Sequence, residues 1–364
     1  MYFLRLAFFL FLTTLSLAAG FGGRRGPLVL EQADILRSIT RDTEQIRILI
    51  NNVKFSQDDI HIRCDYAEFY SEARRVYMRG NVYVEDSTQI LMADEVNYYE
   101  ATGIAEANGN VKVIQPDGKT VYCRRLDYDY DRGISTYRGA VVFIDSVRRT
   151  TVTGEMATYD EILREADVTV QPKLVKKDST GQHPLTITGR RLWMNDSLRQ
   201  ARVEAEVVIT KDTLQATGGF LVFDDSTGIS TLTRSPKLVR GREVMTADSM
   251  RFLFIEDQLN DMIAIGTVVA LSPADSTPLS PLNRITGMNL HSYFEKGDAK
   301  RILVWGNAKS RYYIRDKASD NGVNVASGDT LDIDFVNKEI DAIRIVGGVE
   351  GTYYPIGWKR EIDD

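Results

Sequence analysis

The side chains that could carry chemistry in this sequence are three histidines and a few acidic runs. His61, His183 and His291 are far apart and share no spacing typical of a metal site. The runs that begin at Asp127 and Asp224 could bind calcium or act as paired carboxylates, but they fall where strands are expected to end in turns. The sequence contains no Gly-x-Ser-x-Gly elbow and no phosphate-binding glycine loop. We therefore expect no enzyme activity, no catalytic or cofactor-binding residue, no cofactor and no metal ligand.

Two cysteines, Cys64 and Cys123, could form a disulfide in an exported protein. Both fall at the same place in a sequence repeat, where the unit between them has Ala93. If successive units stack about 4.8 Å apart, two steps separate the thiols by about 10 Å, beyond the roughly 7 Å limit for a disulfide. The spacing predicts two buried free thiols.

The composition is that of a folded globular protein. Of 364 residues, 43% are hydrophobic and 26% are charged. The formal net charge of -6 argues against a nucleic-acid partner, which would need a basic face.

The first residues, Met1 to about Gly20, have the pattern of a targeting segment. Arg5 supplies a positive charge, residues 6–12 form an apolar run, and either Ser16-Leu17-Ala18 or Ala18-Ala19-Gly20 offers a small-residue cleavage site. The run is shorter than the roughly 20 residues of a spanning helix, so we expect a cleaved signal peptide rather than an uncleaved anchor. The mature chain should then be soluble and lie outside the cytoplasm.

A Gly-Asn-Val motif recurs along the mature chain and indicates a repeat architecture. The steps between copies are mostly about 27 to 31 residues, with three near 40, and about ten units cover the chain. Clear and degenerate copies occur at Asn52-Val53, Gly80-Asn81-Val82, Gly109-Asn110-Val111, Gly139-Ala140-Val141, Asp167-Val168, Glu206-Val207, Lys237-Leu238, Gly266-Thr267-Val268, Gly306-Asn307-Ala308 and Gly348-Val349.

A second motif leads each unit, a small residue followed by a polar one, as in Cys64-Asp65 and Ala93-Asp94. Residues around both motifs alternate between apolar and polar types, which is the period of a strand with one buried face. The one helical candidate is Glu31 to Leu49, but its place in the repeat predicts a strand. Polar insertions at 176–183, 272–281 and 316–322 are expected to be loops. The pattern favours an all-β protein.

The two motifs together resemble the OstA/LptA-like family of lipopolysaccharide-transport periplasmic proteins. The resemblance rests on three stretches: Cys64 through Val82, Met92 through Val111, and Cys123 through Val141. It implies an elongated open β-jelly roll, V-shaped like a taco, built from about ten repeats of antiparallel strands. It also implies a periplasmic location and an apolar interior that holds acyl chains.

The expected organisation is a signal peptide at 1–20, a flexible lead at 21–29, the repeat domain at 30–354 and a C-terminal tail at 355–364. The repeat domain could be one continuous roll or two lobes with a break near 176–183 or 272–281. The sequence leaves both arrangements open.

The residues expected to line a lipid groove are the alternating apolar positions of the clearest units. Any one of them could instead be ordinary core, because a strand interior looks the same against protein or lipid. Lys119, in a polar break, is expected to be exposed. The candidate lining residues are Val82, Val84, Val111, Val113, Tyr128, Val141, Phe143, Val207, Ile209, Phe252 and Phe254.

The resemblance implies a carrier that binds the acyl chains of lipopolysaccharide or a related glycolipid and passes it from the inner to the outer membrane for outer-membrane assembly. Its partners would be inner- and outer-membrane components of the export machine, bound through the terminal strand edges at 31–53 and 328–354, with head-to-tail self-association also expected. Two alternatives stay open: a structural β-repeat scaffold that carries no lipid, and a polysaccharide-acting β-solenoid enzyme.

Overall fold

The structure is a computed structural model, and the elements that it describes are β-strands. The expected signal peptide, the lead up to residue 25 and the tail from residue 356 lie outside the described residues. No helix that could span a membrane occurs among the residues that are described. These are residues 26, 28–41, 44–87, 89–116, 118–177, 184–224, 226–255, 258–295, 298–316, 319–337 and 339–355.

The stretch from Glu31 to Leu49 forms strands, as its place in the repeat predicts. Strands β1 (Val29–Gln32) and β2 (Ile35–Arg41) both pair with β3 (Glu44–Gln57) in antiparallel fashion. The partial helical period of this stretch is overridden because β3 is paired on both sides, with β1 and β2 on one and with β4 on the other.

The chain divides into two compact units, and one ends at Ala201 where the other begins at Arg202. The prediction of one roll or of two lobes with a break near 176–183 or 272–281 stays a prediction. Residues 178–183 of the first of these segments lie outside the described part.

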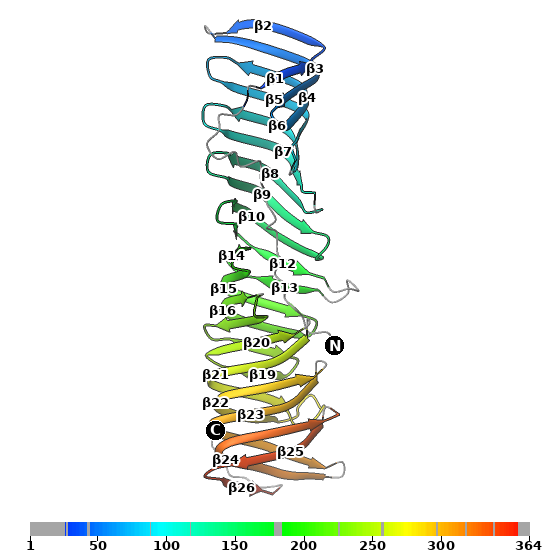
Figure 1. Cartoon of the computed structure of the whole chain (residues 1–364). Coiled ribbons are helices and arrows are strands. Elements are labelled where there is room, and N and C mark those ends of the chain that lie inside the picture. Colours follow the sequence, from blue (N-terminus) through cyan, green and yellow to red (C-terminus); the bar gives the residue numbers. More distant parts are fainter. Residues whose placement is uncertain are drawn as a thin grey trace. The chain divides into compact units, whose positions relative to one another are not determined.

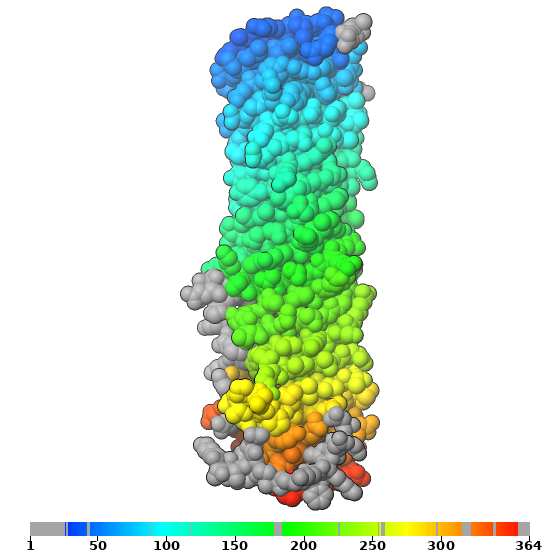
Figure 2. Space-filling view, turned by 180° about the vertical axis from the view of Figure 1, so that it is seen from behind, coloured from blue at the N-terminus to red at the C-terminus, as the bar shows by residue number. Residues whose placement is uncertain are grey.

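The first unit is a succession of antiparallel strands, each paired with the next along the chain from β3 to β11. Figure 1 shows them lying one above the other, from blue to green. In Figure 2 the same strands follow in bands of colour, so each stretch of sequence forms one level. After β1 to β3 the strands are β4 (Ile60–Tyr70), β5 (Arg75–Glu85), β6 (Ile90–Tyr99), β7 (Ile104–Ile114), β8 (Thr120–Asp129), β9 (Ile134–Asp145), β10 (Thr150–Asp160), β11 (Glu165–Thr169), β12 (Lys173–Lys176), β13 (Leu185–Thr188) and β14 (Arg191–Asn195).

The second unit is also antiparallel, and its later strands are long. Its core is formed by buried residues that include Met250, Leu290 and Val304. Strand β15 (Gln200–Lys211) begins at the boundary. The others are β16 (Leu214–Asp224), β17 (Ile229–Thr233), β18 (Lys237–Arg240), β19 (Glu243–Thr246), β20 (Ser249–Ile255), β21 (Gln258–Pro273), β22 (Leu282–Glu295), β23 (Asp298–Asp316), β24 (Ser319–Val336), β25 (Glu339–Val346) and β26 (Glu350–Tyr354).

The Gly-Asn motif is a β-bulge in the middle of a strand. In β5, Gly80 and Asn81 have φ values of 75° and 48°, and the register with β6 shifts between Arg79 and Val82. Two residues of β5 are thus accommodated opposite Asp94 alone. Glycine and asparagine suit these positions because they adopt positive φ more readily than other residues.

The bulge keeps the apolar face of each strand directed inward. Met78 and Val82 of β5 are both buried and lie four positions apart, whereas Cys64 and Ala67 of β4 are both buried but three apart. A one-residue slip would turn every side chain beyond it to the opposite face. The bulge compensates for that slip, so both strands bury side chains before and after the motif.

Each long strand of the first unit is also bent at this point. The rings of Tyr137 and Phe143, which lie on either side of Gly139-Ala140 in β9, pack edge to face with centroids 5.5 Å apart. In a straight strand their Cα atoms would be about 20 Å apart. The two halves of the strand therefore face each other. This supports the V-shaped all-β arrangement that the sequence predicts.

We call the facing halves the first wall and the second wall. The first wall contains residues 66–70, 75–79, 95–99, 104–108, 125–129, 134–138 and 156–160, together with β11 and β14. The second wall contains residues 60–63, 82–85, 90–93, 111–114, 120–123, 141–145 and 150–154, together with β12 and β13.

One predicted motif, Asp167-Val168, does not mark a bend. The positive φ values belong to Val170 and Gln171, at 59° each, and Pro172 follows them. Proline has no N–H to donate to a ladder, so the strand is interrupted here and continues as β12. The motif predicted at Lys237-Leu238 is displaced in the same way.

Candidate functional site

The predicted lining residues of the first unit do face the space between the walls. Val82, Val111, Val113, Tyr128, Val141 and Phe143 are buried, and Val84 is partly buried. Of those in the second unit, Val207 is buried, whereas Ile209 and Phe252 are partly buried. Phe252 packs against the core of that unit, and the side chain of Phe254 lies outside the described part. That these residues line a lipid groove stays a prediction.

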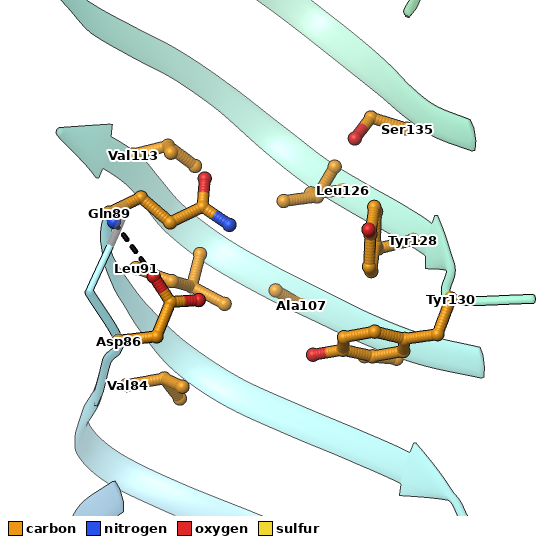
Figure 3. A pocket seen from close by; sticks show the side chains of 11 residues that line it. Val84, Asp86, Gln89, Leu91, Ala107, Val113, Leu126, Tyr128, Tyr130 and Ser135 are labelled. Atoms are coloured by element: carbon orange, nitrogen blue, oxygen red, sulfur yellow. Dashed lines mark hydrogen bonds between the residues drawn. The ribbon is translucent and has the colours of Figure 1, made fainter. Parts of the chain in front are cut away.

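A cavity of about 40 Å³ lies between the two walls at the level of β7. Val84, Leu91 and Val113 line it from the second wall, and Leu126 and Tyr128 line it from the first. Figure 3 shows these side chains converging on the space over Ala107. The structure therefore brings together three of the predicted lining residues, Val84, Val113 and Tyr128, around one cavity.

The cavity exists because β7 has small residues where its neighbours have larger ones. The inward residues of the first wall are Ala105 and Ala107 in β7, but Val76 and Met78 at the matching positions of β5. The difference of several methylene groups leaves a void that the surrounding strands do not close. Reading the matching positions of successive repeats side by side could have located this hollow.

A second cavity, of about 20 Å³, lies farther along the same interior. Phe143 of the predicted set lines it together with Val121, Tyr137, Tyr159 and Met194. Both cavities are much smaller than the roughly 300 to 1,000 Å³ of a pocket that encloses a whole ligand. The interior is thus largely filled by the protein's own side chains, and a long acyl chain would fit only if the walls moved apart.

Comparison with known proteins shows a similarity over this part of the molecule. Residues 26–183 match the family model described as OstA-like protein. Over these residues the chain is similar to the OstA-like family. This confirms the resemblance carried by the repeated motifs, and the matched residues include most of both cavities.

A solved structure also shows similarity, at 15% identity and a TM-score of 0.30. The aligned region spans 34% of this chain and 94% of the chain in that structure. That structure is described as the crystal structure of LptH, the LptA-homologous periplasmic component of the conserved lipopolysaccharide transport device from Pseudomonas aeruginosa. No curated protein matches the chain.

The OstA-like segment has a polar column at the outer end of the second wall. Val53, Phe55 and Gln57 occupy consecutive inward positions in β3, and the last of them is polar. The inward-facing residues of β7 and β9 are likewise followed by a polar one, Gln115 and Asp145 respectively. We did not predict these residues, because we followed the alternation only through its apolar members. Extending it by two residues would have found them.

The outer end of the first wall carries aromatic residues instead. Tyr128 packs edge to face on Tyr130 with ring centroids 4.3 Å apart, and Tyr98 lies 6.0 Å from Tyr130. Tyr159 occupies the inward position on β10 that corresponds to Tyr128 on β8. The interior of the OstA-like segment is therefore closed on one side by polar groups and on the other by tyrosines.

A half-buried carboxyl lies among these tyrosines. The Tyr128 hydroxyl donates to Glu161, at 3.1 Å from Oε1 and 3.2 Å from Oε2. Burial raises the pKa of Glu161 to about 8, the Tyr128 hydrogen bond opposes this, and the nearby charges of Asp160 and Asp86 add to it. At neutral pH the carboxyl is largely protonated, which suits its place beside an apolar interior.

One prediction about a polar residue, that Lys119 is exposed, is wrong. Lys119 is buried at 6% exposure, because it lies in a tight turn where its carbonyl accepts from the N–H of Gln115 at 2.9 Å. The acidic run that begins at Asp127 spans the end of β8 and the turn after it, as predicted, and Asp127 itself pairs with Arg125 and Arg138.

The histidines do not form a common site in the part of the chain that is described. His291 Nε2 lies 2.7 Å from Asp261 Oδ1, and His61 is exposed. His183 lies outside the described residues. Within those residues no group of three or more His, Cys, Asp or Glu side chains could hold a metal ion.

Proposed function

We propose that this chain is a periplasmic carrier in lipopolysaccharide transport, and that it binds acyl chains between its two walls. The observation that carries the proposal is the inward apolar face, which continues through the bend at successive levels of an OstA-like segment. Each buried CH₂ group contributes about 0.8 kcal/mol, so acyl chains can be held without any polar or catalytic group. The passage of the glycolipid from the inner to the outer membrane is part of the same proposal.

Photocrosslinking in living cells tests this binding. The photoreactive amino acid benzoylphenylalanine replaces Tyr128 or Phe143, which face the interior, and Tyr122, which lies on β8 with its side chain 39% exposed. All three positions are aromatic, so the substitutions are closely matched. We expect lipopolysaccharide adducts from Tyr128 and Phe143 but none from Tyr122. Folded protein that yields adducts from none of the three, or equally from all three, would contradict the carrier.

The partners are proposed to bind at the terminal strands of the two units. In the first unit every residue of β1 and β2 except Ile39 is exposed, and Leu36 has 57% of its surface exposed. In the second unit β25 and β26 pair only with β24 among the described residues, and Val346 is 61% exposed. Unpaired edges with apolar side chains recruit further strands. They fit inner- and outer-membrane components or another copy of this chain.

A structural scaffold without lipid would use the same edges, so the two functions need separate tests. Leu36→Lys and Val346→Lys place charges on exposed positions and should leave the fold intact. We expect each variant to lose assembly with its partner, measured by co-purification from cells and by light scattering, while Tyr128 adducts persist in purified protein. Assembly that is unaffected by both variants would exclude these edges.

A further inference from the structure

A row of outward-facing side chains crosses the outer face of the second wall and continues onto β3. Each member lies opposite the next one on the neighbouring strand, from β3 to β8. Strands in a sheet are about 4.8 Å apart, so the five steps span about 24 Å. We call these residues the outer row: Lys54, Arg63, Tyr83, Met92, Lys112 and Tyr122.

The cations of the outer row have no carboxylate partner. Lys54 and Arg63 are exposed and lie directly opposite each other, an arrangement of like charges that destabilises a sheet. Within the described part of the chain, neither they nor Lys112 form an ion pair with a carboxylate. Glu85 lies on the same face of β5, where it accepts a hydrogen bond from the Tyr83 hydroxyl at 3.1 Å. The outer row therefore presents a local positive charge in a chain whose formal net charge is -6.

The outer face of the first wall shows how the same problem is solved inside the molecule. Arg125 and Arg138 also lie opposite each other, but Asp127 pairs with both of them. Arg191 pairs in the same way with Asp167, at 2.7 Å. The first wall thus neutralises these cations with its own carboxylates, whereas the outer row of the second wall leaves its cations available to an anion from outside.

The outer row is also apolar and aromatic between its cations. Met92 is 37% exposed and Tyr122 is 39% exposed. The Arg63 guanidinium lies 3.8 Å from the ring centroid of Tyr83, and Lys112 Nζ lies 5.6 Å from that of Tyr122, so both cations stay on this face. Partly exposed isoleucines lie beside the row, farther from the bend: Ile90, Ile114 and Ile144.

We propose that the outer row binds the surface of a membrane that contains anionic phospholipids. Such a surface attracts lysine and arginine and accommodates tyrosine and aliphatic side chains at the level of its headgroups. A second copy of this chain is a poorer fit, because two outer rows facing each other would bring like charges together. An acidic protein is also a poorer fit, because lysine is depleted at protein interfaces.

This inference goes beyond the proposed function and does not depend on it. The outer row lies on the opposite side of the second wall from the interior that is proposed to hold acyl chains. The headgroups concerned are those of phospholipids, so Tyr122 is still expected to yield no lipopolysaccharide adduct.

Co-sedimentation with vesicles tests the proposal. The mature chain is mixed with vesicles of pure phosphatidylcholine, or of phosphatidylcholine and phosphatidylglycerol in equal parts, at low and at high salt. We expect about tenfold tighter binding to the anionic vesicles than to the neutral ones. High salt should remove the difference, because it screens the attraction between the cations and the headgroups.

Two arginines offer a matched pair of variants. Arg63 and Arg79 are both exposed, and each guanidinium lies over a tyrosine ring, that of Tyr83 and that of Tyr66 respectively. Arg79 belongs to the outer face of the first wall, so Arg63→Gln and Arg79→Gln remove the same charge and the same kind of contact from opposite faces. We expect Arg63→Gln to weaken binding to anionic vesicles about fivefold and Arg79→Gln to leave it unchanged.

A fluorescent label shows which face touches the vesicle. Tyr122→Cys and Tyr77→Cys place a thiol on the outer face of the second wall and of the first wall, respectively. The natural cysteines are buried, so a polarity-sensitive label enters at the introduced thiol. On anionic vesicles we expect the emission to shift to the blue at position 122 and to stay unchanged at position 77. Circular dichroism verifies that each variant is folded.

The outcomes separate this inference from acyl-chain binding. Salt-sensitive binding that Arg63→Gln weakens, with a blue shift at position 122 alone, supports the membrane-binding face. Equal binding to neutral and anionic vesicles overturns it, because acyl chains held between the walls do not require a headgroup charge. Equal losses in Arg63→Gln and Arg79→Gln overturn it as well. If no vesicle is bound while position 122 is protected from labelling in living cells, an acidic protein covers the outer row and the membrane is excluded.

Discussion

The side-chain amide of Asn81 donates to Asp65 Oδ2 at 2.8 Å, and Asn110 makes the same bond to Asp94, also at 2.8 Å. In both pairs the asparagine is the second residue of the bulge, and the aspartate belongs to the preceding strand, at the motif that leads each unit. The two recurring sequence motifs are therefore the two halves of one structural feature. It fixes the bend in β5 and β7 and so keeps the two walls facing each other at these levels.

The first prediction concerns the glycine of this bend. A Cβ added at Gly80, whose φ is 75°, would lie 2.6 Å from Asp65 Oδ2, the atom that accepts from Asn81. Gly80→Ala should therefore strain the backbone and displace Asp65, and we expect the free energy of unfolding to fall by about 1 to 3 kcal/mol. Urea denaturation followed by circular dichroism measures the change.

The matched control is Gly118→Ala. Gly118 has a φ of 84°, but no atom lies within 4 Å of the added Cβ. It should show only the cost of positive φ, about 1 kcal/mol. Equal losses in the two variants would mean that contact with Asp65 does not contribute.

The second prediction is a pH dependence from Glu161. Its pKa is raised from 4.5 to about 8, chiefly by burial. Because the folded state holds the proton more tightly, the stabilisation is complete below about pH 4.5 and is lost as pH rises through about 8. The free energy of unfolding should decline across this range, and Glu161→Gln should make the decline smaller. A variant with the same slope as the native chain would show that Glu161 is ionised in the folded state.

The third prediction concerns the two thiols. Cys64 and Cys123 are free and buried, as the repeat predicts, but the predicted spacing was wrong because each repeat contains two strands. Four steps from β4 to β8 give about 19 Å. Burial raises the pKa of both thiols to about 12. Iodoacetamide at pH 8 should label neither in the folded protein and both in urea, as mass spectrometry would show. Rapid labelling of the folded chain would contradict this burial.

The sequence predicts the fold well where the physical signal is local. Gly80 and Asn81 indicate a bulge because few other residues adopt positive φ readily. Val82 and Val84 show the alternation of a strand. Val170 and Gln171 form a similar bend without this signature, so it could not be located from residue type. There Pro172 interrupts the strand and determines where the bend falls.

The candidate site was less predictable from the sequence because it depends on which strands are neighbours in the sheet. Val113 and Tyr128 could be identified as inward-facing from alternation alone. The hollow, however, results from the difference between Ala107 and the larger Met78 two strands away. That difference becomes visible only when the register of β5, β6 and β7 is known.

The fourth prediction concerns acid stability of the second unit. Arg301 donates to both oxygens of Asp332, at 2.8 and 2.9 Å, and Arg344 donates at 3.2 Å. The Arg301 hydrogen bonds are the largest cause that lowers the pKa of Asp332 below 3.8. Since the folded state favours the ionised form, this stabilisation is present above about pH 3.8 and is lost as pH falls through the lower folded pKa.

Asp332→Asn should therefore lower the melting temperature at pH 7 and leave a smaller difference from the native chain below pH 3. The control is Asp341→Asn, which replaces a carboxylate at an exposed position on β25. Scanning calorimetry at both pH values makes the comparison. Loss of the ionised carboxylate lowers the melting temperature only in the pH range where Asp332 carries charge. If Asp332→Asn lowers the melting temperature equally at both pH values, the asparagine acts by disturbing packing instead.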